Sequence, residues 1–407
     1  MPTFVVYCRC RSAFRIAAGE SVRRGVGGGA LPWIDIRSRY LGRPAQHVAR
    51  DLLIELRLRA ETLEGAINSG LQGAHSQLLA LTVAANAFAD DPALECAYRV
   101  DAGVAEREWA QGYKPPEHPI PPNSRALDAR PAAALAQAAD SHPEARRFGR
   151  VLAFYRESLR HARVGSSLLA VEYLHIAAET LTPILRSRLE CMLGVEESEL
   201  ARRLEVSPKA QNPGKALLSA IRLRDIYRGD KQLARSVERT SNGFEHGFAD
   251  LSDARDQAQT VHARAAEHIR AAIIEASGLT RKHRQCLRGA GYAVPMPLFA
   301  NEYVYVGTLR GVNEQALTPG APPLKALRDW NMKVDRSQIQ PDGLLVTTSS
   351  DTKGPADGAS VDLGALVQSM PVGLPAGARV PEHRLRSIEI RPTRKTSDGS
   401  KVRQRQR

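Results

Sequence analysis

The chain has 407 residues, enough for two or three domains, and its 43% hydrophobic and 25% charged residues are typical of soluble globular proteins. Its longest apolar run, residues 78–89, is shorter than the ~20 residues that cross a bilayer, so we expect neither a transmembrane protein nor a membrane partner. The five cysteines, at positions 8, 10, 96, 191 and 286, form no disulfide framework. These features predict a cytoplasmic protein.

The net charge of +13 comes from the two ends of the chain. Residues 1–44 carry a net charge of +6 and residues 384–407 a net charge of +7, so the part between them is neutral overall. Flexible cationic arms contact nucleic-acid phosphates without sequence specificity. The tail therefore supplies three candidate RNA-binding residues, Arg403, Arg405 and Arg407, with a solvated tail as the alternative.

Composition and apolar periodicity predict an α+β fold, and the first half of the chain divides into three segments. Residues 1–45 are interrupted by glycines, which predicts a poorly ordered basic segment with one short strand at most. Residues 46–111 show strand-like alternation, then a long helical pattern and a second short strand, which predicts a small α/β unit. Residues 112–143 are rich in proline and alanine and predict a linker.

The second half of the chain is predicted to be helical first and β-rich afterwards. Residues 144–280 contain apolar stripes at helical spacing, typical of a helical bundle, and the most apolar stretch, about 167–193, predicts its central helix. Residues 281–392 alternate short β-prone runs with glycine and proline, which predicts a β-rich region. Residues 393–407 are the basic tail.

A narrow polar stripe runs along one face of the predicted central helix. Its residues recur at steps of three and four: Glu172, His175, Glu179, Thr182 and Arg186. Burying such groups costs free energy unless each finds a partner. The stripe therefore indicates either one wall of a polar site between helices, with Glu172 and His175 as binding residues, or a structural or solvent-facing row.

The segment 239–248, Arg-Thr-Ser-Asn-Gly-Phe-Glu-His-Gly-Phe, lies between two predicted helices. A histidine exchanges protons near neutral pH, and an arginine stabilises charge on a phosphate. Arg239 and His246 therefore suit metal-independent cleavage of RNA, in which the 2′-hydroxyl is the nucleophile. The alternative is a glycine-broken helix junction in which Asn242 is a cap. We expect no metal site and no cofactor, because no ligand spacing or nucleotide-binding loop is present.

The bundle, its glutamate-bearing central helix and the Asn242-x3-His246-Gly247 segment resemble the HEPN superfamily, in a divergent, ApeA-like form, over residues 146–277. The resemblance implies a bundle of four to five helices, often dimeric, that is an RNase of defence or toxin systems in many members. It implies that Arg239 and His246 form a catalytic pair, with Asn242 as a polar neighbour and Glu179 in the same cleft. In the commonest motif, Arg-Asn-x3-His, the arginine would stand where this chain has Ser241.

Two strings, Ser-Asn-Gly-Phe-Glu-His-Gly-Phe at 241–248 and Ala-Glu-Thr-Leu-Thr at 178–182, are also similar to MauJ, an uncharacterised family of methylamine-utilisation accessory proteins. The departure from the commonest HEPN motif favours a HEPN-like accessory, interaction or RNA-binding protein without catalysis. The alternative is a metal-independent endoribonuclease of a defence or stress system that uses the Arg-x6-His pair. The expected partners are RNA and a second copy of the chain.

Overall fold

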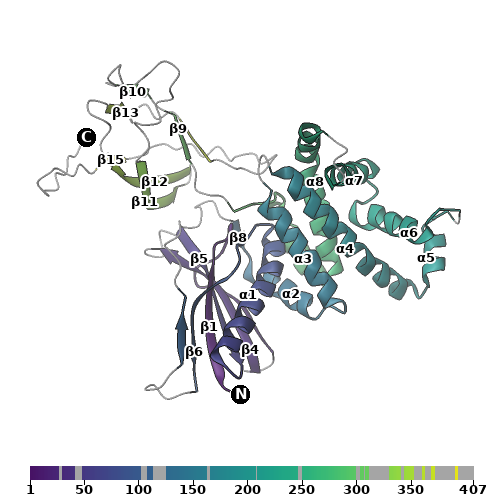
Figure 1. The fold of residues 1–407 in the computed structure, drawn as a ribbon, viewed down its shortest axis with the longest axis horizontal. Helices are drawn as coiled ribbons and strands as arrows, with labels where there is room; N and C mark the ends of the chain where they lie inside the picture. Colours follow the sequence, from purple (N-terminus) through teal and green to yellow (C-terminus); the bar gives the residue numbers. More distant parts are fainter. Residues whose placement is uncertain are drawn as a thin grey trace, which may run out of the picture. The chain divides into compact units, whose positions relative to one another are not determined.

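The computed structural model describes residues 1–26, 30–41, 48–101, 108–112, 125–162, 166–207, 209–245 and 250–298, together with the strands of the C-terminal region (Figure 1). The chain divides into two units. The first comprises Met1–Tyr40, Ala49–Phe299 and Gly373–Ala378, and the second comprises Leu41–Val48, Ala300–Val372 and Arg379–Arg407. The first unit combines helices with an antiparallel sheet, which confirms the predicted α+β class.

A six-stranded sheet forms the N-terminal part of the first unit, with the strand order β3-β4-β5-β1-β6-β7. Its strands are β1 (Thr3–Cys10), β3 (Val22–Val26), β4 (Ala30–Leu41), β5 (Val48–Arg59), β6 (Ala93–Arg99) and β7 (Trp109–Gln111). Strand β1 lies inside the sheet, because Val6 is paired with Leu56 of β5 on one side and with Ala97 of β6 on the other, both antiparallel.

The prediction of a poorly ordered segment at residues 1–45 is wrong for its described residues, 1–26 and 30–41, which form strands of the sheets. Its arginines do not form a solvated basic arm, because several of them pair with carboxylates on neighbouring strands. Arg39 of β4 lies 2.6 Å from both Asp51 of β5 and Glu95 of β6. Residues 46–111 are likewise not a separate unit, since β1 is inserted between β5 and β6. The N-terminal segment therefore completes the sheet.

Helix α1 (Leu63–Ala85) packs against β1 and β6, and the Thr62 hydroxyl caps it by accepting a hydrogen bond from the Gly65 amide. The helix approaches the sheet closely at Gly70, where a Cβ would lie 2.9 Å from Val6 Cγ1. Helix α2 (Ala129–Asp140) packs against α1. The predicted linker thus ends in a helix, while its residues 113–124 lie outside the described part of the chain.

Before α2, the short strand β8 (Arg125–Leu127) pairs in parallel with β2 (Phe14–Ile16).

The helical part of the first unit follows α2 (Figure 1). Its elements are α3 (Ala145–Arg160), α4 (Ser167–Leu193), α5 (Glu197–Arg203), α6 (Pro213–Ile221), the π-helix η3 (Arg222–Ile226), α7 (Lys231–Glu245), α8 (Leu251–Ala276), α9 (Arg281–Leu287) and the 3₁₀ turn η4 (Ala290–Tyr292). Helix α4 packs against α3, α7 and α8. Among the described helices, α4 alone is long and apolar enough to cross a membrane, but 67% of that window is buried inside the protein, as in a core helix.

Two arginines join β8 and α8 to the C-terminal end of α1, the half-buried Arg125 and the buried Arg270. Arg270 of α8 donates hydrogen bonds of 2.7 and 2.8 Å to the carbonyls of Val83 and Ala84, and Arg125 of β8 donates two of 2.7 Å to those of residues 85 and 86. The last carbonyls of a helix have no partner within it. The two guanidinium groups satisfy all four and place a positive charge at the negative end of the helix dipole.

In the described part of the second unit the elements are strands. They are β9 (Tyr303–Val306), β10 (Thr308–Arg310), β11 (Trp330–Gln340), β12 (Gly343–Thr352), β13 (Ser360–Asp362), β14 (Gln368–Pro371) and β15 (Ile390–Pro392). Strands β11 and β12 form an antiparallel pair, and β15 pairs with β12 in parallel.

Candidate functional site

The polar stripe of α4 faces inward along most of its length. Glu172 and His175 are only 8% and 7% exposed, and Thr182 is fully buried. The Glu179 side chain is half exposed, and Arg186 pairs with Glu197 of α5 at 3.2 Å. Packing of α7 and η3 against α4 explains the burial. The stripe is therefore one side of a polar cluster between helices and not a solvent-facing row.

Glu172 is joined to α7 by a buried hydrogen bond, in which the Ser241 hydroxyl donates to Glu172 Oε2 at 2.8 Å. Both side chains are buried, so the bond is shielded from water. The hydrogen bond therefore joins α7 to α4 at Ser241.

Glu179 is engaged by Arg222 of the π-helix. Arg222 Nη2 lies 3.3 Å from Glu179 Oε1, and Arg222 Nε lies 3.4 Å from Thr182 Oγ1. His175 Nε2 also lies 3.6 Å from Glu179 Oε1. A π-helix inserts one extra residue into a helical turn and re-aims the side chains that follow. Arg222 is the first residue of η3, and from there its side chain reaches α4, a contact that its sequence position does not indicate.

Tyr227 lies directly after the π-helix and is 1% exposed. Its hydroxyl has no hydrogen-bond partner among the described residues. Burial raises the pKa of this phenol above its usual value, and the charges of Glu238 and Glu179 raise it further, against a lowering by Arg222. The phenol therefore keeps its proton at neutral pH and adds a buried donor to the polar cluster.

The outer face of α7 carries an unpaired basic stripe, formed by Lys231, Arg235 and Arg239 at steps of four residues, which we call the α7 stripe. All three side chains are exposed, and none of them pairs with a carboxylate in the described part of the chain. Asn242 is exposed one turn further on, and Phe244, an aromatic residue, is 38% exposed at the same end of the helix.

The predicted site residues fall into separate places. Arg239 and Asn242 lie on the exposed side of α7, whereas Glu179 pairs with Arg222. His246 lies outside the described residues, so the predicted Arg239–His246 pair stays a prediction. The tail candidates Arg403, Arg405 and Arg407 also lie outside them. Glu172 and His175 lie in the polar cluster as binding candidates.

No group of three or more histidine, cysteine, aspartate or glutamate side chains that could hold a metal ion occurs among the described residues. The Cys8 and Cys10 thiols on β1 are buried in the core beneath α1. Burial raises the pKa of Cys8 to about 12, which keeps it protonated and unreactive.

Comparison with known proteins adds no assignment: no family model matches the chain, and no curated protein and no solved structure matches it.

Proposed function

We propose that the protein is a HEPN-like RNA-binding protein that acts without catalysis, and that the α7 stripe contacts the RNA. The observation that carries the proposal is the spacing of Lys231, Arg235 and Arg239, three exposed cations about 6 Å apart along one helix face with no carboxylate partner among the described residues. Cations that no carboxylate neutralises are free to contact phosphates.

Single-stranded RNA is the nucleic acid that fits the neighbouring residues. Its bases are unstacked and available, and aromatic side chains stack on them. Phe244, at the end of α7, offers such a surface, and the exposed Asn242 offers an amide for hydrogen bonds to base edges. The expected partner is therefore an unpaired strand.

The Ser241–Glu172 hydrogen bond supports binding without cleavage. Ser241, at the position where the commonest HEPN motif has arginine, makes a buried structural contact with Glu172. Glu179 is paired with Arg222. Stabilising the charge of a phosphoryl transition state requires a preorganised cation aimed at the reacting phosphate. In this proposal Arg239 serves as an exposed phosphate contact.

The test measures binding of a fluorescent single-stranded RNA by the full chain, with Arg235→Ala/Arg239→Ala and the control Arg146→Ala/Arg150→Ala. The control removes two exposed arginines of α3 at the same four-residue spacing. We expect the α7 variant to bind at least about tenfold more weakly and the control to bind like the parent, because each lost phosphate contact reduces affinity. Equal affinity of all three proteins would refute the α7 stripe as the RNA site.

The same proteins are incubated with RNA in chelator beside His246→Ala. We expect no cleavage by any of them. Cleavage that disappears in His246→Ala, with the helical content intact, would establish the endoribonuclease instead.

A further inference from the structure

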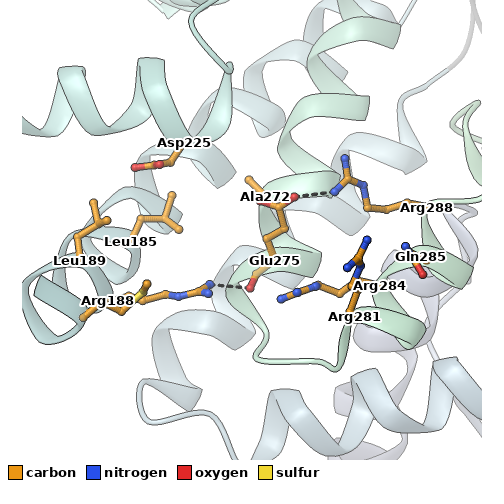
Figure 2. A pocket seen from close by; sticks show the side chains of 11 residues that line it. Leu185, Arg188, Leu189, Asp225, Ala272, Glu275, Arg281, Arg284, Gln285 and Arg288 are labelled. Carbon is orange, nitrogen blue, oxygen red and sulfur yellow. Dashed lines mark hydrogen bonds and ion pairs between the residues drawn. The ribbon is translucent and has the colours of Figure 1, made fainter.

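A pocket of about 740 Å³ lies between α4, η3, α8 and α9 (Figure 2). Four arginines line it: Arg188 of α4, Arg281 and Arg284 of α9, and Arg288, the residue that caps the end of α9. Among the described residues, the acidic side chains that line it are Asp225 and Glu275. The pocket shares no residue with the α7 stripe.

Two of the four arginines are held in place by the protein. Arg288 Nη1 pairs with Glu275 Oε1 at 2.6 Å, and Arg188 donates to the Glu275 backbone carbonyl at 2.6 Å. The other acid, Asp225, pairs with Arg224 at 2.8 Å. Both carboxylates that line the pocket are therefore already paired with an arginine, Glu275 with Arg288 and Asp225 with Arg224. They do little to neutralise the remaining arginines of the pocket.

Arg281 and Arg284 remain without a counter-ion. Their guanidinium groups make no hydrogen bond or ion pair with any described residue, and Arg284 is partly buried. Helix α9 itself, Arg-Lys-His-Arg-Gln-Cys-Leu, contains no acidic residue. Two such groups one helical turn apart leave two positive charges uncompensated at the pocket.

The opposite wall is aliphatic. Leu185 and Leu189 of α4 face the pocket, and Figure 2 shows them across it from the α9 arginines. Met192 extends this wall and is 68% exposed, a large apolar side chain left in water. A pocket of this volume that combines an apolar wall with a few converging polar groups is typical of small-molecule sites.

We propose that this pocket binds a small amphiphilic dianion, a phosphate monoester with an apolar body. The phosphate lies on Arg281 and Arg284, whose forked donors match phosphate oxygens and whose two charges balance a dianion. The apolar body lies on Leu185, Leu189 and Met192 and removes their surface from water. The site is separate from RNA binding by α7.

The test titrates the full chain with phenyl phosphate by calorimetry, beside inorganic phosphate, which lacks the body, and benzyl alcohol, which lacks the charge. We expect phenyl phosphate to bind at least tenfold more tightly than either. We expect Arg281→Ala/Arg284→Ala to bind phenyl phosphate at least tenfold more weakly than the parent, and the control Arg146→Ala/Arg150→Ala to bind it as tightly as the parent. Circular dichroism confirms that each variant is folded.

Met192→Ser separates the two halves of the site, and its exposed position does not put folding at risk. It weakens phenyl phosphate severalfold and leaves inorganic phosphate unchanged. The proposal is overturned if phenyl phosphate binds no more tightly than inorganic phosphate, or if Arg281→Ala/Arg284→Ala binds it like the parent. Binding of a 5′-phosphorylated RNA at these arginines, without binding of phenyl phosphate, also overturns it. If the protein does not bind RNA through the α7 stripe, the expected binding of phenyl phosphate is unaffected, because the two sites share no residue.

Discussion

The C-terminal end of α1 and the outer face of α7 use the same kind of side chain for opposite purposes. At the end of α1, the buried Arg270 and the half-buried Arg125 donate to the carbonyls of residues 83–86. On α7, Arg235 and Arg239 are exposed and have no carboxylate partner among the described residues. The role of an arginine thus depends on how many of its donors the protein itself satisfies.

The electrostatics of the first region show what burial costs. Burial lowers the pKa of Arg125 and of Arg270 to about 10, against a smaller raising effect of the Tyr155 phenol on both. Both groups stay charged at neutral pH because carbonyl acceptors and the negative end of the α1 dipole replace water. An arginine so committed to the fold is unavailable to a ligand.

Replacing Arg270 at the end of α1 should destabilise the protein more than any other substitution proposed below. Arg270→Met leaves the carbonyls of Ala84 and Leu287 without a donor in the interior, while the Val83 carbonyl keeps its hydrogen bond of 3.2 Å from the Asn86 amide. We expect the free energy of unfolding to fall by about 4 kcal/mol, since each unsatisfied buried acceptor costs about 1 to 3 kcal/mol. Urea denaturation measures it, with the exposed Arg235→Met as the control at about 0.5 kcal/mol or less. A loss below about 1 kcal/mol would show that these bonds do not stabilise the junction.

His262 of α8 is a buried basic group that, unlike Arg125 and Arg270, has no hydrogen-bond partner among the described residues. Burial lowers its pKa to about 4. The pKa of His262 in the folded protein is below its value of about 6.5 in the unfolded chain. The unfolded chain therefore binds a proton first as the pH falls, so the free energy of unfolding is highest above pH 6.5 and decreases toward pH 4. The loss approaches about 3 kcal/mol at pH 4.

The measurement compares the free energy of unfolding of the parent and of His262→Leu at several pH values between these limits. We expect the variant to lose the part of the pH dependence that comes from His262. Parallel curves for the two proteins would mean that His262 is protonated equally in the folded and unfolded states.

A smaller effect is expected at the α4–α7 contact. Ser241→Ala removes the hydroxyl that donates to buried Glu172, and we expect the free energy of unfolding to fall by about 1 kcal/mol, the net contribution of a typical hydrogen bond. Asn242→Ala, at the exposed neighbouring position, serves as the control and should change stability by less than about 0.5 kcal/mol. Equal effects of the two substitutions would remove the structural role assigned to Ser241.

Sequence patterns predicted the helical part best because its apolar stripes are local. The central helix expected at about 167–193 is α4, Ser167–Leu193, and its polar stripe does lie against other helices. A short strand was allowed in residues 1–45, but the place of β1 inside the sheet was missed. Its ladders join it to β5 and β6, which are far along the chain, and no local pattern reports such pairing.

The partners within the site were harder to predict than the stripe itself. Arg222 pairs with Glu179 from the start of a π-helix, an element that leaves no periodic signal in the sequence. The arginine pocket was hard to predict because Arg188 and the arginines of α9 are nearly a hundred residues apart in the sequence. In addition, the region that contains them has no net charge overall. The lack of acidic residues in 281–288 is the one local signal that could have indicated it.

The most direct test of the central claim is the salt dependence of RNA binding. The logarithm of the association constant for a single-stranded RNA is measured against the logarithm of salt concentration for the parent and for Arg235→Ala/Arg239→Ala. Each phosphate contact to a single strand contributes about 0.7 to this slope, so losing two contacts should make the slope shallower by about 1.4. Parallel lines for the two proteins would contradict the assignment of the α7 stripe as the RNA-binding surface.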